Sequence, residues 1–504
     1  MTRATAGEAA GARFGSAASA RLDRRTFLLL GGSALLLTAC QSVSPQPPPP
    51  VPVKTTAAPA PALHDWTIDD LLATQPFYVA HRGSGDNWME HTIDAYSRAI
   101  ALGAGAIEVS VNCTADGVLV CHHDATTKRM TVSDLTIADV TYAELSQLRN
   151  DSRAWLGPAA ALQPIPRLTD VLDAFAATHV IFIEDKQGTN TQALLDVMNG
   201  YPDPTAHFVW KQWAGAKQHA LAAQNGYRTW GYFTEDLYAR VDELAPEFDF
   251  LGVFHTESDA HIAQVVASGK PVIAWEIHFR SMRERMKGLG VAGMMCSNLP
   301  YLTAVSAAAR TDSFASGLRA PGDLPWTTEQ GWSVQPVLDP APATVELNHR
   351  DIQSYLMGSM SPIAVDAYRI TAELCWPDAV PDPTQHAGLA FGLADDRAYR
   401  VRVAGESAGY HVVIRANGSV ELFRRSAQAV DGTLLGQVQT APVAPGTWVR
   451  LDVEVNGNVI RILRLDGDGW SFEVKDSTYR GGYFWLCKNY VGGPGVQFRS
   501  IVVS

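Results

Sequence analysis

The chain has 504 residues, with 40 Lys and Arg against 52 Asp and Glu and a formal net charge of −12 at pH 7. This length suits roughly two to four domains, and a hydrophobic share of 46% excludes a wholly disordered chain. The acidic balance argues against a general nucleic-acid binder, because such proteins need a basic surface. An anionic substrate would need a local cation or a cluster of Arg and Lys.

Residues 1–39 carry the pattern of an export signal. Arg24 and Arg25 precede an apolar run that ends at Cys40, and this run is shorter than the ~20 residues of a membrane-spanning helix. The segment resembles a bacterial twin-arginine signal peptide with a lipoprotein cleavage site. The resemblance implies export, lipidation of Cys40 and an extracytoplasmic protein held at the cell membrane by the lipid anchor only; the alternative is an apolar N-terminal helix. Residues 40–63 are Pro-rich and predict an extended tether.

Residues 64–310 alternate between short apolar runs and amphipathic helix-like segments. This alternation predicts a parallel sheet, and eight runs in about 250 residues predict a (β/α)₈ TIM barrel of the α/β class. One interval, Asn112–Gly117, is too short for a helix. The predicted strands are Phe77–His81, Ala106–Val111, Val118–His123, Val180–Glu184, His207–Lys211, Arg228–Phe233, Phe248–Phe254 and Val272–Trp275.

Residues 331–504, after a predicted linker at 311–330, contain closely spaced strands without helices. This texture predicts an all-β antiparallel sandwich. Three hairpin turns are predicted at Asn417-Gly418, Asn456-Gly457 and Asp466-Gly467. The predicted strands are Tyr399–Val403, Tyr410–Ala416, Ser419–Arg424, Trp448–Val455, Val459–Leu465 and Ser471–Val474.

Five cysteines follow Cys40, without the spacing of a zinc site. We expect most of them to be buried apolar residues. Cys375 and Cys487 form the one pair worth testing for a disulfide.

Polar residues stand at the ends of most predicted barrel strands, where the active sites of such barrels lie. Paired imidazoles can act as general acid and base, paired carboxylates can hold a hard cation, and Arg with Lys can neutralise a phosphate. Together these residue types indicate phosphoryl transfer to water or to an internal hydroxyl. They are His81, Arg82, Glu108, Ser110, Asn112, His123, Glu184, Lys186, Lys211 and Glu276.

Several short motifs follow one another in the order of a known family. They are Ala80-His81-Arg82-Gly83, Glu90-His91-Thr92, Ile107-Glu108-Val109-Ser110, His123-Asp124 and Ile183-Glu184-Asp185-Lys186. Over about residues 75–305 the chain resembles the glycerophosphodiester phosphodiesterase family. The resemblance implies a (β/α)₈ barrel that hydrolyses small-molecule or polymeric glycerophosphodiesters to glycerol phosphate and an alcohol, with Ca²⁺ or Mg²⁺ as cofactor.

The resemblance also implies roles for individual residues. One histidine would take a proton from the glycerol hydroxyl, which attacks phosphorus to give a cyclic phosphate, and the other would protonate the leaving alcohol. Which histidine does which stays open. The matching residues comprise two catalytic histidines, two phosphate-binding cations, two metal ligands and a carboxylate that lines the site: His81 and His123; Arg82 and Lys186; Glu108 and Glu184; and Glu90.

The metal site is where the chain departs most from the family pattern. The family has Glu-x-Asp on the second strand, whereas this chain has Glu108-Val109-Ser110, and a hydroxyl is a poor replacement for a metal-ligating carboxylate. We therefore expect weakened affinity for the divalent ion. Asn112, on the same strand face, could supply an oxygen ligand. Glu276, at a strand end across the barrel, could supply the missing negative charge.

The C-terminal region resembles a concanavalin-like or laminin-G-like sandwich, a fold that often binds glycans through exposed aromatic residues. This resemblance implies a cell-wall glycan as a partner of the sandwich; the alternative is that these aromatic residues fill its core. The candidates are Trp470, Tyr483, Phe484, Trp485 and Tyr490.

Three functions remain open at this stage. The leading hypothesis is a lipid-anchored phosphodiesterase that acts on glycerophosphodiesters at the cell surface. The second is a barrel that has lost catalysis at Ser110 and serves as a wall-binding or glycan-binding lipoprotein. The third is a phospholipase-D-like phosphodiesterase on choline or sphingolipid substrates, and the sequence does not distinguish the head groups.

Overall fold

The computed structural model describes residues 65–323, 335–348, 354–399 and 407–504. The predicted export signal, Cys40 and the tether lie outside these residues, as do most of the predicted strand Tyr399–Val403 and part of the 311–330 linker. None of the helices in the described part is long and apolar enough to cross a membrane.

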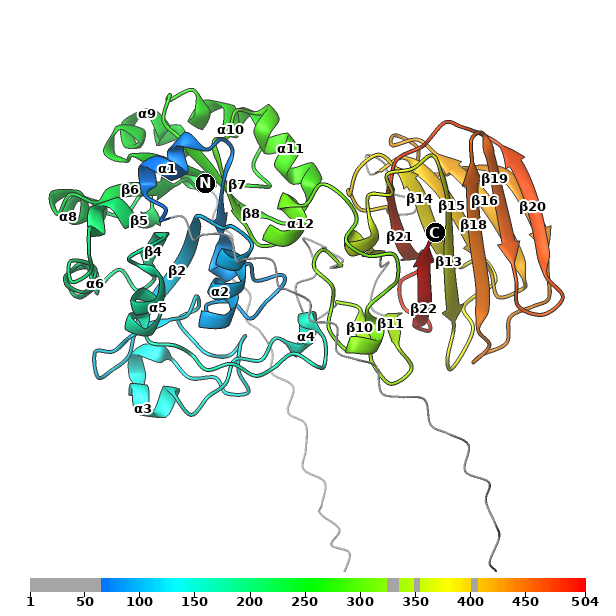
Figure 1. The fold of residues 1–504 in the computed structure, drawn as a ribbon, viewed down its shortest axis with the longest axis horizontal. Helices are drawn as coiled ribbons and strands as arrows, with labels where there is room; N and C mark the ends of the chain where they lie inside the picture. Colours follow the sequence, from blue (N-terminus) through cyan, green and yellow to red (C-terminus); the bar gives the residue numbers. More distant parts are fainter. Residues whose placement is uncertain (1–64, 324–334, 349–353, 400–406) are drawn as a thin grey trace, which may run out of the picture. The chain divides into compact units, whose positions relative to one another are not determined.

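Eight parallel strands close into a barrel, coloured blue to green in Figure 1. β1 pairs with β2 on one side and with β9 on the other, which closes the sheet. The predicted TIM barrel is therefore confirmed. The barrel strands, in the order β1, β2, β4, β5, β6, β7, β8 and β9, are Phe77–Ala80, Ala106–Cys113, Val180–Asp185, Phe208–Trp213, Arg228–Tyr232, Phe250–Phe254, Val272–Ile277 and Gly293–Cys296.

One predicted barrel strand is wrong and another was missed. The run after Gly117 forms β3 (Leu119–Cys121), which pairs antiparallel with β2 and does not enter the barrel. The short interval before it explains this, because a parallel connection needs about a dozen residues whereas a hairpin needs only a turn. The eighth barrel strand is β9 instead, whose sequence Gly-Met-Met-Cys has no β-branched or aromatic residue to indicate a strand.

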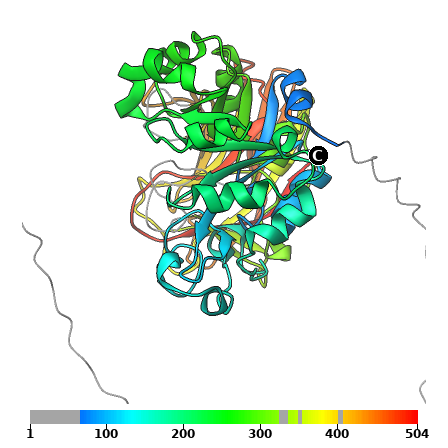
Figure 2. The same ribbon diagram turned by 90° about the vertical axis from the view of Figure 1, so that its left-hand side faces the viewer.

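Helices cover the outside of the barrel strands (Figures 1 and 2). The longer helices bury apolar residues against the strands; α5, for example, buries Leu168, Val171, Leu172 and Phe175. The α-helices α1 to α12 are Ile68–Ala73, Ile93–Ala101, Tyr142–Leu145, Arg153–Leu156, Leu168–Phe175, Thr191–Met198, Pro204–His207, His219–Gln224, Val241–Leu244, Asp259–Val266, Arg280–Gly288 and Leu299–Thr303. The 3₁₀ segments η1 to η5 and η7 are His81–Gly83, Ile137–Asp139, Glu235–Arg240, Ala245–Glu247, Phe314–Ser316 and Gly358–Met360.

The C-terminal region forms two antiparallel sheets that share one hydrophobic core. The hairpins predicted at Asn417-Gly418, Asn456-Gly457 and Asp466-Gly467 are confirmed. One sheet has the order β10-β11-β22-β13-β18-β19-β20 and the other β12-β21-β14-β15-β16-β17. Strands β10 to β22 are Val337–Asp339, Thr344–Leu347, Ser354–Leu356, Ala367–Cys375, Ala387–Leu393, Gly409–Ile414, Ser419–Arg425, Thr433–Gln439, Val449–Asn456, Val459–Arg464, Trp470–Lys475, Tyr483–Lys488 and Val496–Val503.

Three of the five aromatic residues proposed for glycan binding are buried. They are Phe484, Trp485 and Tyr490, of which Phe484 belongs to the hydrophobic core of the two sheets, as the core alternative predicts. Trp470 and Tyr483 are half-buried. Glycan binding by this region stays a prediction, now with fewer candidate residues.

The five described cysteines are all free thiols. Cys113 is half-buried and the other four are buried, as the sequence predicts. Cys375 and Cys487, the pair considered for a disulfide, are both among the free cysteines.

Candidate active site

A sharp turn after β1 places His81 and Arg82 at the carboxyl end of the barrel strands. Arg82, Gly83 and Ser84 have φ angles of 54°, 84° and 73°, all in the left-handed region. Gly83 is required there, because a Cβ atom would lie 2.8 Å from the Cβ of Ala95. The turn also directs the backbone N–H of Arg82 to Oε2 of Glu108, at 3.1 Å.

Both predicted catalytic histidines have one ring nitrogen held by a neighbouring side chain. Nδ1 of His81 lies 2.9 Å from Oγ of Ser297, directly after β9. Nδ1 of His123 lies 2.7 Å from Oδ1 of Asp124. These contacts fix the orientation of each ring and leave Nε2 as the nitrogen that a substrate can meet.

The two histidines differ in their electrostatic surroundings. Burial, followed by the charge of Arg82, lowers the pKa of His81 to about 3, so His81 is neutral at neutral pH. Burial and Arg82 also lower the pKa of His123, but the hydrogen bond with Asp124 raises it again. Asp124 itself stays ionised, because its bonds with His123 and Arg129 outweigh burial and lower its pKa.

Arg82 is held between two carboxylates. Its guanidinium Nη1 lies 3.3 Å from Oε2 of Glu90 and Nη2 lies 3.3 Å from Oε1 of Glu276. Glu90 also accepts two hydrogen bonds from Arg129, at 2.6 and 3.1 Å. Burial would raise the pKa of Glu90, but Arg82 and Arg129 hold it well below its ordinary value.

The two predicted metal ligands share a lysine. Nζ of Lys211 donates a hydrogen bond to Oε1 of Glu108 at 2.7 Å and forms an ion pair with Oε2 of Glu184, also at 2.7 Å. Lys186 approaches the same oxygen of Glu184 at 3.4 Å, and the hydroxyl of Tyr232 donates to its other oxygen at 2.8 Å. Glu108, Glu184 and Lys211 thus form one buried ionic cluster.

All three groups of this cluster are charged. Burial opposes the ionisation of Glu108, but Lys211 holds its pKa well below the ordinary value. The same balance of burial against Lys211 lowers the pKa of Glu184. Burial would lower the pKa of Lys211, yet Glu108 and Glu184 raise it.

The side chains at this position do not fit a divalent cation. Ca²⁺ and Mg²⁺ need several oxygen ligands that carry negative charge, whereas both carboxylates here are already paired with an ammonium group. Ser110 donates its hydroxyl to Glu108 at 3.1 Å. Within the described residues, no group of three or more His, Cys, Asp or Glu side chains could hold a metal ion.

Neither residue expected to rescue the metal site joins the two glutamates. The amide nitrogen of Asn112 donates to the backbone oxygens of His122 and Asp124, so this side chain holds the loop that carries His123. Glu276 contacts Arg82, and it lies 3.8 Å from Nδ1 of His81.

The sequence did not predict three residues that contact the candidate site residues, and it indicated Lys211 only as the end of a strand. Tyr232 stands at the end of β6, so the strand-end rule could have found it. Ser297 would have followed had β9 been recognised as a strand. Arg129 lies in a loop, and nothing in its local sequence connects it with Glu90.

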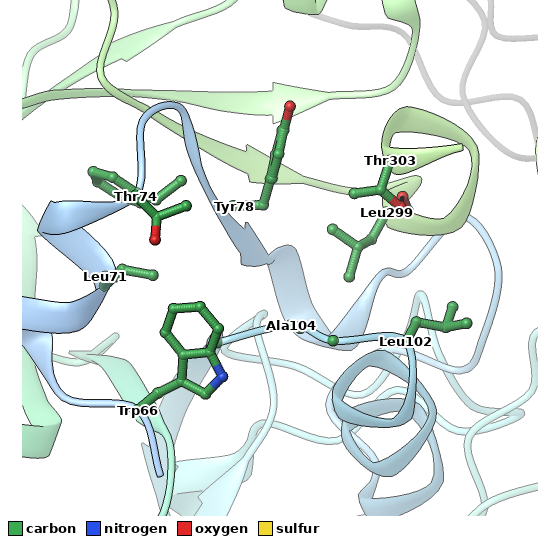
Figure 3. A pocket seen from close by; sticks show the side chains of 11 residues that line it. Trp66, Leu71, Thr74, Tyr78, Leu102, Ala104, Leu299 and Thr303 are labelled. Carbon is green, nitrogen blue, oxygen red and sulfur yellow. Dashed lines mark hydrogen bonds between the residues drawn. The ribbon is translucent and has the colours of Figure 1, made fainter. Parts of the chain in front are cut away.

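A small apolar pocket lies at the start of β1, away from the strand ends that carry these residues (Figure 3). Its volume is about 90 Å³, and its lining includes Trp66, Leu71, Tyr78 and Leu299. No charged side chain lines it. This pocket therefore offers no counter-charge to an anionic substrate.

Comparison with known proteins agrees with the resemblance seen in the sequence. Residues 81–295 match the model of the "Glycerophosphoryl diester phosphodiesterase family". A glycerophosphodiester phosphodiesterase of Caldanaerobacter subterraneus subsp. tengcongensis is 38% identical over 111 residues, which cover 22% of this chain and 45% of that protein. One of Bacillus subtilis is 34% identical over 116 residues, covering 21% and 39%. The chain spans less than half the length of these relatives.

A solved structure of an Oleispira antarctica phosphodiesterase, in complex with the product sn-glycerol-3-phosphate, is 19% identical with a TM-score of 0.39. The likeness covers 45% of this chain and 95% of that one. The family match itself begins at the first histidine of the site and ends in β9, the last barrel strand. Over residues 81–295 this chain is thus similar to the glycerophosphoryl diester phosphodiesterase family.

Proposed function

We propose that the barrel hydrolyses glycerophosphodiesters to glycerol phosphate and an alcohol, with His81 and His123 as the groups that move protons. The observation that carries this proposal is a pair of histidines, one directly after β1 and one in the loop after β3, each with Nδ1 held and Nε2 free for a substrate. Arg82 and Lys186 stand at the same end of the barrel and supply positive charge for the phosphate.

The first step forms a cyclic phosphate. His81, which is neutral at neutral pH, takes the proton of the glycerol hydroxyl next to the phosphate. The hydroxyl oxygen bonds to phosphorus, and the bond from phosphorus to the alcohol oxygen breaks. Protonated His123 gives its proton to that leaving oxygen. Asp124 supports this role, because its carboxylate stabilises the protonated ring.

The second step opens the cyclic phosphate with water. Neutral His123 takes a proton from water, whose oxygen bonds to phosphorus, while the bond to the glycerol oxygen breaks. Protonated His81 returns its proton to that oxygen. Both histidines are then back in their starting states, and one water has been consumed.

Turnover of glycerophosphocholine and glycerophosphoethanolamine by the folded full chain tests the proposal directly. Released glycerol phosphate is measured with Ca²⁺, Mg²⁺ or Mn²⁺ added, and again with a chelator. We expect release from at least one of these substrates. If the folded protein released no glycerol phosphate under any of these conditions, the result would support the alternative that the barrel is a non-catalytic binding module.

We expect Asp124→Asn to move the alkaline limb of the kcat/KM profile to lower pH. His123 must be protonated in the first step, so kcat/KM falls about tenfold for each pH unit above its pKa. Asp124 raises that pKa, so loss of its charge lowers it and the decline begins earlier. Steady-state rates between about pH 5 and pH 8 measure the shift.

Asp134→Asn is the matched control for this pH shift, because Asp134 pairs with Lys128 at 3.1 Å on the exposed part of the same loop. Its profile should overlie that of the wild type. A limb that stayed in place, or moved to higher pH, in Asp124→Asn would show that His123 is not the acid of the first step.

We also propose that the chain is exported and held at the cell membrane by a lipid on Cys40. The support is the order of Arg24, Arg25, the apolar run and Cys40, which all lie outside the described residues. We expect Cys40→Ser to abolish labelling by radioactive palmitate and to move the protein from the membrane to the soluble fraction. Cys113→Ser, at a half-buried thiol, is the control; membrane retention of Cys40→Ser would contradict the anchor.

A further inference from the structure

We propose that the ammonium group of Lys211 takes the place of a divalent cation between Glu108 and Glu184, so that the barrel cleaves phosphodiesters without a metal ion. This inference rests on the proposed function and concerns the source of positive charge at the same site.

The first support is the position of Lys211. Glu108, Glu184 and Lys211 come from the neighbouring strands β2, β4 and β5, and β4 lies between the other two. The ammonium nitrogen is 2.7 Å from an oxygen of each carboxylate. The side chains of Lys211, Glu108 and Glu184 are only 9%, 0% and 5% exposed. A cation that bridges these two carboxylates is thus already built into the chain.

The second support is the balance of charge. Two carboxylates with one ammonium carry a single net negative charge, and three carboxylates would need a divalent cation to reach the same value. Ser110 presents a neutral hydroxyl next to Glu108. The absence of a carboxylate at Ser110 and the presence of an ammonium at Lys211 therefore compensate each other.

The third support is the cost of displacing the lysine. A divalent ion between the two carboxylates would have to replace the ammonium, and a buried ammonium that has lost its partners is strongly unfavourable. The rings of Trp230 and Tyr232 lie 5.6 and 5.8 Å from Nζ of Lys211, a distance at which aromatic faces attract a cation. The two rings therefore also stabilise the ammonium group of Lys211 in this position.

The ammonium group of Lys211 supports the reaction because it is already in position before the negative charge develops. Negative charge grows on the phosphoryl oxygens as the new bond to phosphorus forms. Cations that are already in place stabilise this charge without a cost of reorganisation. Lys211 keeps Glu108 and Glu184 from repelling the substrate phosphate, while Arg82 and Lys186 face it.

The first experiment uses the wild-type full chain after exhaustive chelation. We expect its hydrolysis of a glycerophosphodiester to stay within about twofold of the untreated rate, and added CaCl₂, MgCl₂ or MnCl₂ to change it no further. Calorimetric titration of the same sample with CaCl₂ should show no saturable binding, and CaCl₂ should leave its melting temperature unchanged.

The second experiment adds a carboxylate and removes the ammonium group in the double variant Ser110→Asp/Lys211→Ser. It has three carboxylates and no ammonium, so we expect saturable CaCl₂ binding, a melting temperature that rises with CaCl₂, and hydrolysis that stops in chelator. Ser110→Thr/Lys128→Ser is the matched control: it keeps the hydroxyl at position 110 and removes an exposed lysine. This control should stay indifferent to CaCl₂.

Stoichiometric binding of Ca²⁺ or Mg²⁺ by the wild type, or loss of its activity in chelator with recovery on metal addition, would overturn the inference. The wild-type titration decides this even where the double variant does not fold. A folded wild type without turnover under any condition would count against the phosphodiesterase function, while the titration would still decide the role of Lys211.

Discussion

Replacing either His81 or His123 by alanine is expected to lower kcat/KM by about 10²- to 10⁴-fold, the usual contribution of a positioned acid or base. Each histidine exchanges a proton in both steps of the proposed reaction, so neither can be bypassed. The side chains held against them cannot take over the proton transfer, because the hydroxyl of Ser297 is too weak an acid and base and Asp124 is ionised. Release of glycerol phosphate at substrate concentrations well below KM measures the loss.

His179→Ala is the matched control for these two variants. His179 is also a buried histidine, but it lies just before β4 begins, at the far end of that strand from Glu184. It should keep activity within a few-fold of the wild type. His81→Gln keeps most of the side-chain volume, so the same loss in a variant with an unchanged melting temperature would exclude unfolding as its cause. An alanine variant with rates near those of the wild type would remove that histidine from the mechanism.

The parts of the fold that could be predicted are those governed by local pattern. Seven of the eight barrel strands match a predicted strand, because buried parallel strands are near-continuous apolar runs. β3 and β9 could not be assigned in this way. An apolar run does not reveal whether it pairs parallel or antiparallel, and β9 has no β-branched or aromatic residue, so only its pairing with β1 and β8 identifies it as a strand.

The candidate site shows the same division. The rule that parallel strands end at one edge brings Glu108, Glu184 and Lys186 together correctly. It does not reveal that Lys211 reaches back between the two glutamates, because that depends on the lateral order of β2, β4 and β5 and on side-chain length. The expectation of a weakened metal site followed from Ser110 alone; the lysine that balances it becomes visible only in three dimensions.

Replacing Glu90 by leucine is expected to destabilise the protein by about 3 kcal/mol, since removal of one partner of a buried ion pair leaves an uncompensated charge. Glu90 is 6% exposed and pairs with both Arg82 and Arg129. We place the loss at the lower end of the range for buried pairs because Arg82 keeps Glu276 and Arg129 keeps Asp124. Urea unfolding monitored by circular dichroism measures it.

The dependence of this effect on pH separates charge from packing. The folded-state pKa of Glu90 lies well below its ordinary value of 4.5, so the stability that its charge contributes is complete above about pH 4.5 and is lost only as the pH falls through the folded-state pKa. Glu90→Gln keeps the shape and removes the charge. Its difference from the wild type should therefore be constant near neutral pH and shrink in acid.

Glu243→Leu provides the comparison, because Glu243 forms an exposed ion pair with Arg240 on the protein surface. Such pairs contribute at most about 1 kcal/mol, so this variant should unfold close to the wild type. Equal losses in Glu90→Leu and Glu243→Leu would contradict a buried network around Arg82. A large loss at Glu90 alone would show that its buried ion pairs with Arg82 and Arg129 contribute to the stability of the fold.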